Sequence, residues 1–142
     1  MPMDPNRWTL KTQEAFNDAI SRARTDNNPE VVPAHLLSAL LGQQEGVVLP
    51  ILEKVGANPT PLRNRVEDEL SRLPKAYGSE ARLSRELESV VDAADAARTE
   101  LGDEYLSTEH LLLALADRID VTREQVLTAL REVRGSHRVT SQ

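Results

Sequence analysis

Two histidines at equivalent places in the chain are the residues best suited to do chemistry. His35 lies in the run Val-Val-Pro-Ala-His-Leu-Leu-Ser-Ala-Leu, and His110 lies in the similar run Leu-Ser-Thr-Glu-His-Leu-Leu-Leu-Ala-Leu, at a sequence offset of 75. An imidazole can act as a base, a metal ligand or a hydrogen-bond partner. The histidines are not four residues apart on one helix, and no HExxH pattern surrounds them. We therefore expect each to be structural, bonded to a helix end or to backbone, and we expect no metal site.

Other catalytic patterns are also missing from the sequence. It contains neither GxxxxGK[ST] nor GxGxxG, so nucleotide chemistry within these residues is not expected. The serines lack the context of a nucleophile elbow. The acidic run Glu67-Asp68-Glu69 is typical of a solvated helix face. We predict a binding domain without catalytic residues or a cofactor of its own, and an all-α enzyme is the least favoured alternative.

The amino-acid composition indicates which kinds of binding partner and which cellular compartment to expect. The chain has 142 residues, the size of one domain, and its 17 basic and 23 acidic residues give a net charge of −6. That charge opposes binding to nucleic acid and to anionic membranes. The absence of cysteine fits a reducing cytoplasm, and we see neither a signal peptide nor an apolar run of about 18 residues. We expect a cytoplasmic protein with no nucleic-acid or membrane partner.

Apolar periodicity in the sequence predicts the helices that carry these histidines and pack around them. Stripes at i, i+3 and i+4 predict amphipathic helices, and polar or proline residues mark their starts. The predicted helices begin after Thr9, at Pro33, at Val48, at Thr60-Pro61, at Ser84, at Ser107 and after the capping box of Thr122 and Gln125. No segment shows the sustained alternation of a strand, so we predict no β-structure.

The two halves have different lengths. Leu87, Val90 and Val91 match the first predicted helix at the offset of 75, but Val126 and Leu130 match Val66 and Leu70 at an offset of 60. The second half therefore lacks a counterpart of the helix Val48–Val55, and residues 117–121 supply at most a short turn. We predict an all-α fold of two pseudo-repeats of a four-helix unit, the second shortened, packed as one globular domain. Repeat one covers about 9–74, a linker 75–82, repeat two about 83–135, and a C-terminal linker 136–142.

A shallow groove is one interpretation of the helix that begins at Ser84. Ala93, Ala96 and Ala97 lie outside its main apolar stripe, so small side chains there would form the floor of a groove. Alanine is also the best helix former, and this explains the same residues equally well. Both interpretations stay open.

The paired helix starts carry a resemblance that covers nearly the whole chain, from about Asp4 to Gly135. At Val31-x-x-x-His35-Leu36-Leu37 and Leu106-Ser107-Thr108-Glu109-His110-Leu111-Leu112 the sequence resembles the Clp N-terminal repeat domain, found ahead of the ATPase rings of AAA+ unfoldases. The start Asp4-x-x-Arg7-Trp8-Thr9 and the pair Leu73-Pro74 are most similar to the ClpB disaggregase branch.

The resemblance implies a binding role. Such domains engage unfolded or aggregated polypeptides through a groove and pass them to a hexameric, ATP- and magnesium-dependent ring that works with a DnaK-type chaperone system. It places polar substrate-contact positions at Thr9, Asp103 and Glu109, and lining positions at Ala93 and Ala97. The isolated domain is expected to be a monomer.

Two other roles remain open within this resemblance. One is an adaptor-docking domain of a protease-coupled unfoldase, similar to ClpA or ClpC. The other is a free-standing interaction protein without an ATPase.

Overall fold

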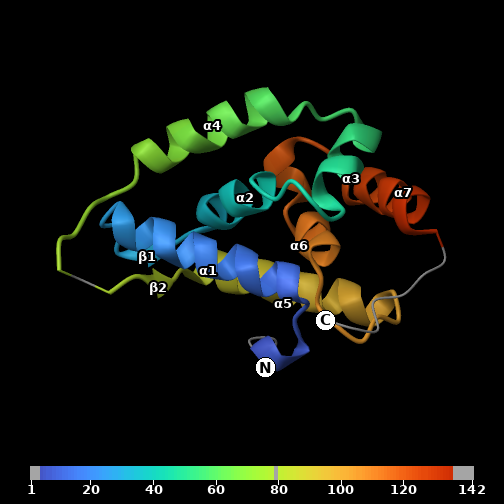
Figure 1. The fold of residues 1–142 in the computed structure, drawn as a ribbon, viewed down its shortest axis with the longest axis horizontal. Coiled ribbons are helices and arrows are strands. Elements are labelled where there is room, and N and C mark those ends of the chain that lie inside the picture. Colours follow the sequence, from blue (N-terminus) through green and yellow to red (C-terminus); the bar gives the residue numbers. More distant parts are fainter. Residues whose placement is uncertain (1–3, 79, 136–142) are drawn as a thin grey trace.

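The fold is built from seven α-helices and two short 3-10 helices in the part of the chain that the computed structural model describes, residues 4–78 and 80–135 (Figure 1). In chain order the elements are η1 (Pro5–Arg7), α1 (Leu10–Thr25), β1 (Glu30–Val31), α2 (Pro33–Leu41), α3 (Val48–Val55), α4 (Pro59–Ser71), β2 (Arg82–Leu83), α5 (Arg85–Glu100), α6 (Thr108–Ala114), η2 (Ala116–Ile119) and α7 (Arg123–Arg134). The predicted all-α fold is confirmed. The predicted linker 136–142 lies outside the described residues.

Most of the helix boundaries follow the local signals in the sequence. Thr9 Oγ1 accepts the Thr12 N–H at 3.2 Å at the start of α1, and Gly56 ends α3 with φ of 79°. The prediction was wrong at α4, which begins at Pro59 instead of Thr60-Pro61. Asn58 caps this helix through its side chain, and Pro59 occupies the first helical position, where no N–H is needed.

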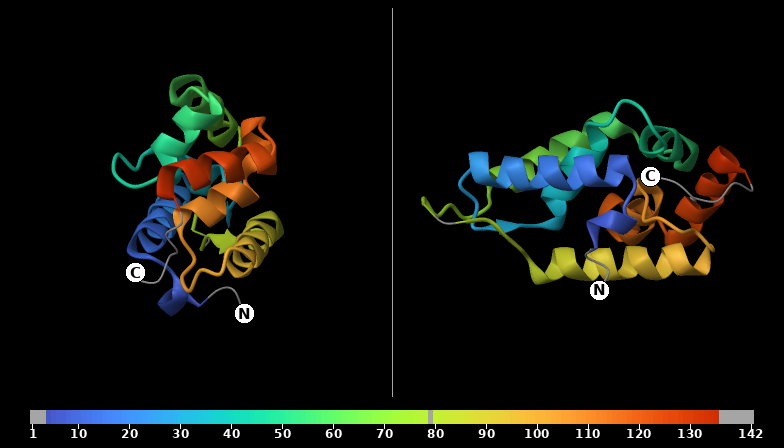
Figure 2. Two further views of the ribbon diagram at one scale, coloured as in Figure 1. Left: turned by 90° about the vertical axis from the view of Figure 1, so that its right-hand side faces the viewer. Right: turned by 60° about the horizontal axis from the view of Figure 1, so that its bottom comes forward.

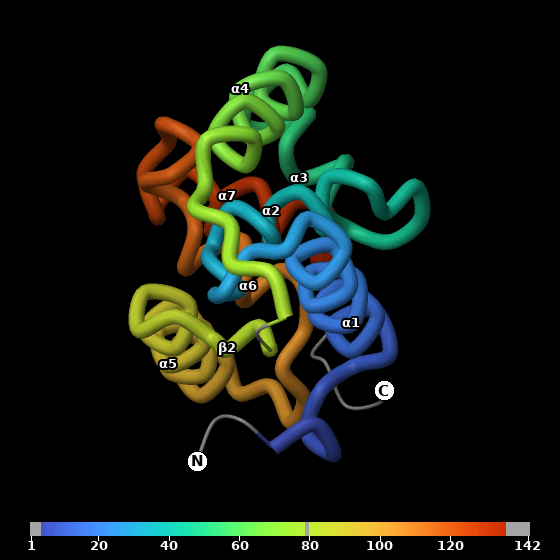
Figure 3. The backbone as a smooth tube through the Cα atoms, turned by 90° about the vertical axis from the view of Figure 1, so that its left-hand side faces the viewer, coloured from blue at the N-terminus to red at the C-terminus, as the bar shows by residue number. Residues whose placement is uncertain are grey.

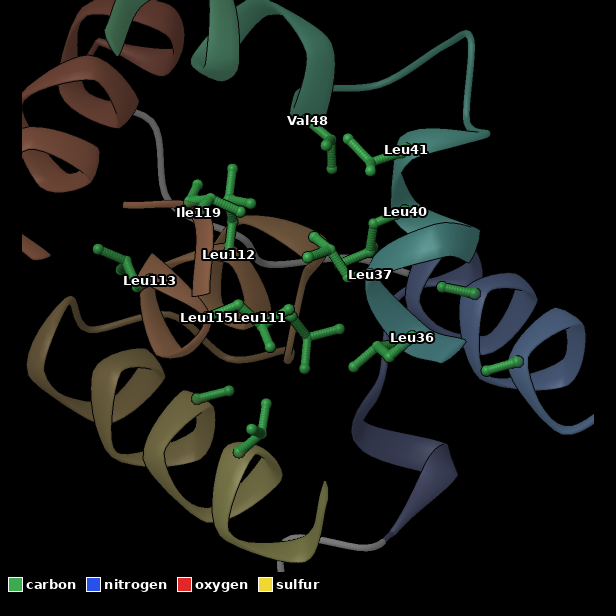
Figure 4. Packing of buried hydrophobic residues seen from close by; sticks show 14 of the residues in the cluster. Leu36, Leu37, Leu40, Leu41, Val48, Leu111, Leu112, Leu113, Leu115 and Ile119 are labelled. Atoms are coloured by element: carbon green, nitrogen blue, oxygen red, sulfur yellow. The ribbon is translucent and has the colours of Figure 1, made fainter. Parts of the chain in front are cut away.

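The two halves pack their helices in the same way. α1 packs on α2 and α4 packs on α2, while α5 packs on α6 and α7 packs on α6. The two leucine-rich helices, α2 and α6, form the centre of the core, and Leu36 and Leu111 are both fully buried. Figure 4 shows the side chains of Leu36 and Leu37 directed toward those of Leu111 and Leu115. The duplicated His-Leu-Leu helices thus create one shared core.

The halves also exchange short strands. Val31 pairs in parallel with Leu83, and Trp8 forms a parallel bridge with Leu106. The repeat offset of 75 relates Trp8 to Leu83 and Val31 to Leu106, so the two pairings are copies of each other. In each half, the residues just before the first α-helix pair with backbone of the other half. Figure 3 shows β2 between α1 and α5. The prediction of no β-structure was wrong at these short pairings, which are too short to show alternation.

The segment predicted as a linker, 75–82, is bonded to the first half. The Ala76 N–H donates to the Asn27 carbonyl at 2.8 Å, and the Arg82 N–H donates to the Pro29 carbonyl at 3.1 Å. The connection therefore follows the turn after α1 and directs the chain into α5.

The helix without a counterpart makes the molecule asymmetric. α3 packs against α7 of the other half and also contacts α6 (Figure 2). In the second half the 3-10 turn η2, Ala116–Ile119, stands where α3 would be, which confirms the expectation of a short turn.

Candidate functional site

His35 closes the start of α2. Its Nδ1 accepts the Val32 N–H at 2.9 Å, which leaves the ring proton on Nε2 to be donated to Asn28 Oδ1 at 2.9 Å. Asn28 Nδ2 in turn donates to the carbonyl of Pro74, just beyond α4, at 3.0 Å. Burial lowers the pKa of His35, and the charge of Arg22 lowers it further, so the ring is neutral.

His110 does the same for α6. Its Nδ1 accepts the Ser107 N–H at 2.8 Å, and its Nε2 donates to Asp103 Oδ2 at 2.7 Å. Burial lowers the pKa of His110, although the hydrogen bond to Asp103 opposes this shift. The expectation that both histidines bond to backbone at a helix start is confirmed.

Asp103 and Glu109, two of the predicted contact residues, share one guanidinium. Arg134 Nη1 lies 2.9 Å from Asp103 Oδ2 and 2.7 Å from Glu109 Oε2, and its Nη2 lies 3.3 Å from Asp103 Oδ1. The Asp103 side chain is 0% exposed and that of Glu109 is 7% exposed. Burial opposes the charge of Arg134, yet the two carboxylates raise its pKa. Arg134 was not predicted from the sequence, although its place in the last turn of a helix favours a cation.

Thr9 lies beside the same segment of the chain. Its N–H donates to the Leu106 carbonyl at 2.9 Å, and the Thr12 hydroxyl donates to that carbonyl at 3.0 Å. Thr9 is largely buried, and its own hydroxyl is occupied at the start of α1. The fold thus brings Thr9 next to the stretch that joins Asp103 to Glu109.

The two predicted lining residues have different environments. Ala93 is exposed, whereas Ala97 is buried in the core, so placing Ala97 outside the apolar face was wrong. A larger side chain at Ala97 would meet packed atoms. Client contact at all five predicted residues remains a prediction.

An apolar surface groove of about 240 Å³ lies along α1 and was not predicted. Trp8, Phe16, Ile20 and Leu83 supply its apolar lining, with Pro5, Gln13 and Asn17 around them. Trp8 stacks on Phe16 with a distance of 4.6 Å between ring centroids. Trp8 and Leu83 are related by the repeat offset, and this was the available signal for their proximity. A larger hollow between α1 and α2, about 580 Å³, is lined mainly by polar and charged side chains of both signs.

Two features are absent from the described ranges 4–78 and 80–135. No helix there is long and apolar enough to span a membrane. No group of three or more His, Cys, Asp or Glu side chains in these ranges could hold a metal ion.

Comparison with known proteins agrees with the duplicated helical architecture. The family described as the Clp repeat (R) N-terminal domain matches residues 7–130. The chaperone protein ClpB of Mycobacterium tuberculosis (strain H37Rv) is 45% identical over 152 residues, which cover 98% of this chain and 18% of that protein. The chain therefore spans less than a fifth of the length of this relative.

Solved structures show the same fold. The Hsp104 N-terminal domain from Candida albicans has a TM-score of 0.81 at 22% identity, with 94% of this chain and 95% of that chain covered. The N-domain of ClpV, in complex with a VipB peptide, has a TM-score of 0.66 at 22% identity, with 92% and 81% covered. With 45% identity to ClpB and a family match across nearly its whole length, this chain belongs to the Clp repeat N-terminal domain family.

Proposed function

We propose that this chain is the client-binding N-terminal domain of a ClpB-type ATP-dependent chaperone, which engages unfolded or aggregated polypeptides and passes them to an ATPase ring. The observation that carries the proposal is the apolar groove formed by Trp8, Phe16, Ile20 and Leu83 on the surface of α1. A folded protein has few apolar segments to offer such a groove, whereas an unfolded chain exposes many.

The size of the groove favours weak binding. A volume of about 240 Å³ accommodates only a few apolar side chains. Burying one such side chain contributes about 1.5–3 kcal/mol, and most of this is offset by the entropy lost on association. A client held so weakly is easily released to a second site.

The remaining expectations concern a longer parent protein. There, we propose, ATP and magnesium act in a separate hexameric ATPase module that works with a DnaK-type chaperone in the cytoplasm. This domain itself acts as a monomeric binding module without catalytic residues, and has neither nucleic acid nor membrane as a partner.

The only tryptophan of the chain tests the groove directly. Trp8 is 5% exposed and lines the groove, so a Trp-free unfolded polypeptide that binds there should change its fluorescence. We expect a saturable change during titration. Ile20→Ser should weaken the apparent affinity about tenfold or more, because one buried aliphatic contact is lost.

The matched control is Leu10→Ser. Leu10 is an apolar residue of the same helix, is 58% exposed and does not line the groove. Its substitution should leave the affinity within about twofold. If both variants lost affinity equally, or if Trp8 emission did not respond to any unfolded chain, the groove would not be the binding site.

Docking of one defined sequence, as on an adaptor, is the second candidate, because the ClpV N-domain was solved with a single peptide, from VipB. Competition between unrelated Trp-free apolar peptides at the groove separates the two roles. Similar weak affinities for all of them favour a client site, whereas tight binding of one defined sequence favours an adaptor site.

A further inference from the structure

The side chain of Arg134 connects three parts of the second half through ion pairs. Asp103 lies in the turn between α5 and α6, Glu109 lies in the first turn of α6, and Arg134 lies in the last turn of α7. The guanidinium bonds to both carboxylates at 2.7–2.9 Å, and the Arg134 side chain is only 13% exposed.

The network continues from the carboxylates to the backbone. Asp103 accepts from His110, which accepts the N–H of Ser107 at the start of α6. Arg98 of α5 donates to the Asp103 carbonyl at 2.9 Å and pairs with Asp95 at 2.7 Å. The start of α6 and the end of α7 are therefore joined through one chain of hydrogen bonds.

The first half contains a neutral version of the same junction. There Asn28 takes the place of Asp103, and its amide donates to the carbonyl of Pro74. Pro74 and Arg134 are related by the offset of 60 that also relates α4 to α7, so both junctions join a helix start to the end of the last helix of the half. In the second half the junction is ionic, and without Arg134 two buried carboxylates would face each other unneutralised.

We propose that Arg134 is a positioning residue, and that Asp103 and Glu109 act through it by holding the end of α7 against the start of α6. They thereby fix the position of the end of α7, and they do not touch the client. The carboxylate oxygens that bond Arg134 are buried in these ion pairs, so a client would have to break the pairs to reach them. Among the described residues, those that line the apolar groove are all outside this network.

Amide hydrogen exchange of the full chain tests the proposal. Arg134→Met should speed exchange in the last turn of α7 and at residues 107–110 by about tenfold or more, the equivalent of about 1.4 kcal/mol. Asp103→Asn keeps an acceptor for His110, as Asn28 does in the first half, and should speed exchange mainly at the end of α7. Arg134→Lys keeps the positive charge but not the two-pronged hydrogen-bonding geometry of a guanidinium. Its amides should therefore be better protected from exchange than those of Arg134→Met, though less than those of the wild type.

The matched control is Arg131→Met, an exposed arginine of the same helix, which should change exchange less than about twofold. The double variant Asp103→Asn/Arg134→Met should exchange no faster than the more affected single variant, because both changes break the same ion pair.

Fluorescence titration with a Trp-free unfolded polypeptide forms a second arm of the experiment. We expect Arg134→Met, at a residue that neither lines the groove nor is a predicted contact position, to leave the affinity at the groove within about twofold. Loss of affinity in Asp103→Asn or Glu109→Gln with unchanged exchange in α7 would show direct client contact and overturn the proposal. Equal exchange in Arg134→Met and Arg131→Met would also overturn it. If the wild-type chain bound no client, the proposed function would fail, and the exchange arm would still decide the role of Arg134.

Discussion

Asn28 and Asp103 occupy the same position in the two halves of the molecule, and each accepts a hydrogen bond from the histidine of the helix that follows it. The distances are 2.9 Å from His35 and 2.7 Å from His110. One junction is neutral and ends on a backbone carbonyl, while the other is charged and ends on Arg134. Equivalent junctions are therefore stabilised by a neutral hydrogen bond in the first half and by an ion pair in the second.

This relationship predicts that Asn28→Asp is harmful although Asp is the natural residue at the equivalent place. The substitution removes the amide donor to the Pro74 carbonyl and directs a carboxylate at that oxygen. We expect the free energy of unfolding to fall by about 1–3 kcal/mol. Urea denaturation measures the loss.

Asn27→Asp is the matched control, since it makes the same chemical change one residue earlier. Asn27 has φ of 58°, a conformation that aspartate also adopts, and it is less buried than Asn28. A loss as large as that of Asn28→Asp would contradict a specific role for the amide.

Stability should fall as the pH falls below about 6.5, the pKa of histidine in an unfolded chain. The fold lowers the pKa of both His35 and His110, mainly through burial, so below this pH the unfolded chain takes up protons that the folded chain does not. Each histidine contributes at most about 1.4 kcal/mol per pH unit in this range. Denaturation between pH 7.5 and 5 measures the slope.

His110→Gln isolates one of the two histidines. Gln125 already accepts the Thr122 N–H at 2.8 Å at the start of α7, so glutamine can make the bond to the Ser107 N–H. The variant should lose the share of the pH slope due to His110. An unchanged slope would show that other groups cause the pH dependence.

The two central leucines should contribute similarly to stability. Leu36 and Leu111 are equivalent in the repeat and are both 0% exposed. Each substitution by alanine should cost about 2–5 kcal/mol in thermal or chemical unfolding, because it removes buried surface and leaves a cavity. Leu10→Ala, at an exposed position, should cost far less. Loss of stability at only one of the two core sites would show that the halves do not share one core.

Ala93 and Ala97 should respond differently to enlargement. Ala97→Leu forces extra atoms into packed surroundings and should cost about 1–3 kcal/mol, whereas Ala93→Leu on the exposed face should change stability by less than about 0.5 kcal/mol. Thermal unfolding checks both. A change in client affinity at Ala93 without a change in stability would establish contact there.

Much of the fold could be predicted from local patterns. Apolar periodicity, the caps at Thr9 and Thr122 and the glycine that ends α3 act within a few residues, so they are visible in the sequence. The start of α4 was misplaced because two prolines, Pro59 and Pro61, compete as its first residue, and the Asn58 cap decides between them.

The site was less predictable, because it depends on long-range proximity. The two histidines bond to backbone at a helix start, as predicted, but their partners Asn28 and Asp103 lie in turns, where no apolar periodicity marks them. Arg134 is far from both Asp103 and Glu109 in the sequence, and only the packing of α7 on α6 brings them together.

The helices, the duplication and the missing counterpart of α3 could all be predicted from the amino-acid sequence, because periodicity and repeat offsets are properties of the chain. Three features became visible only once the helices were packed: the strand pairings of Trp8 and Leu83 with the opposite half, the apolar groove beside them, and the burial of Asp103 and Glu109 against Arg134. Pairing, burial and ion pairing depend on which distant segments share space, and that is settled when the two halves pack into one core.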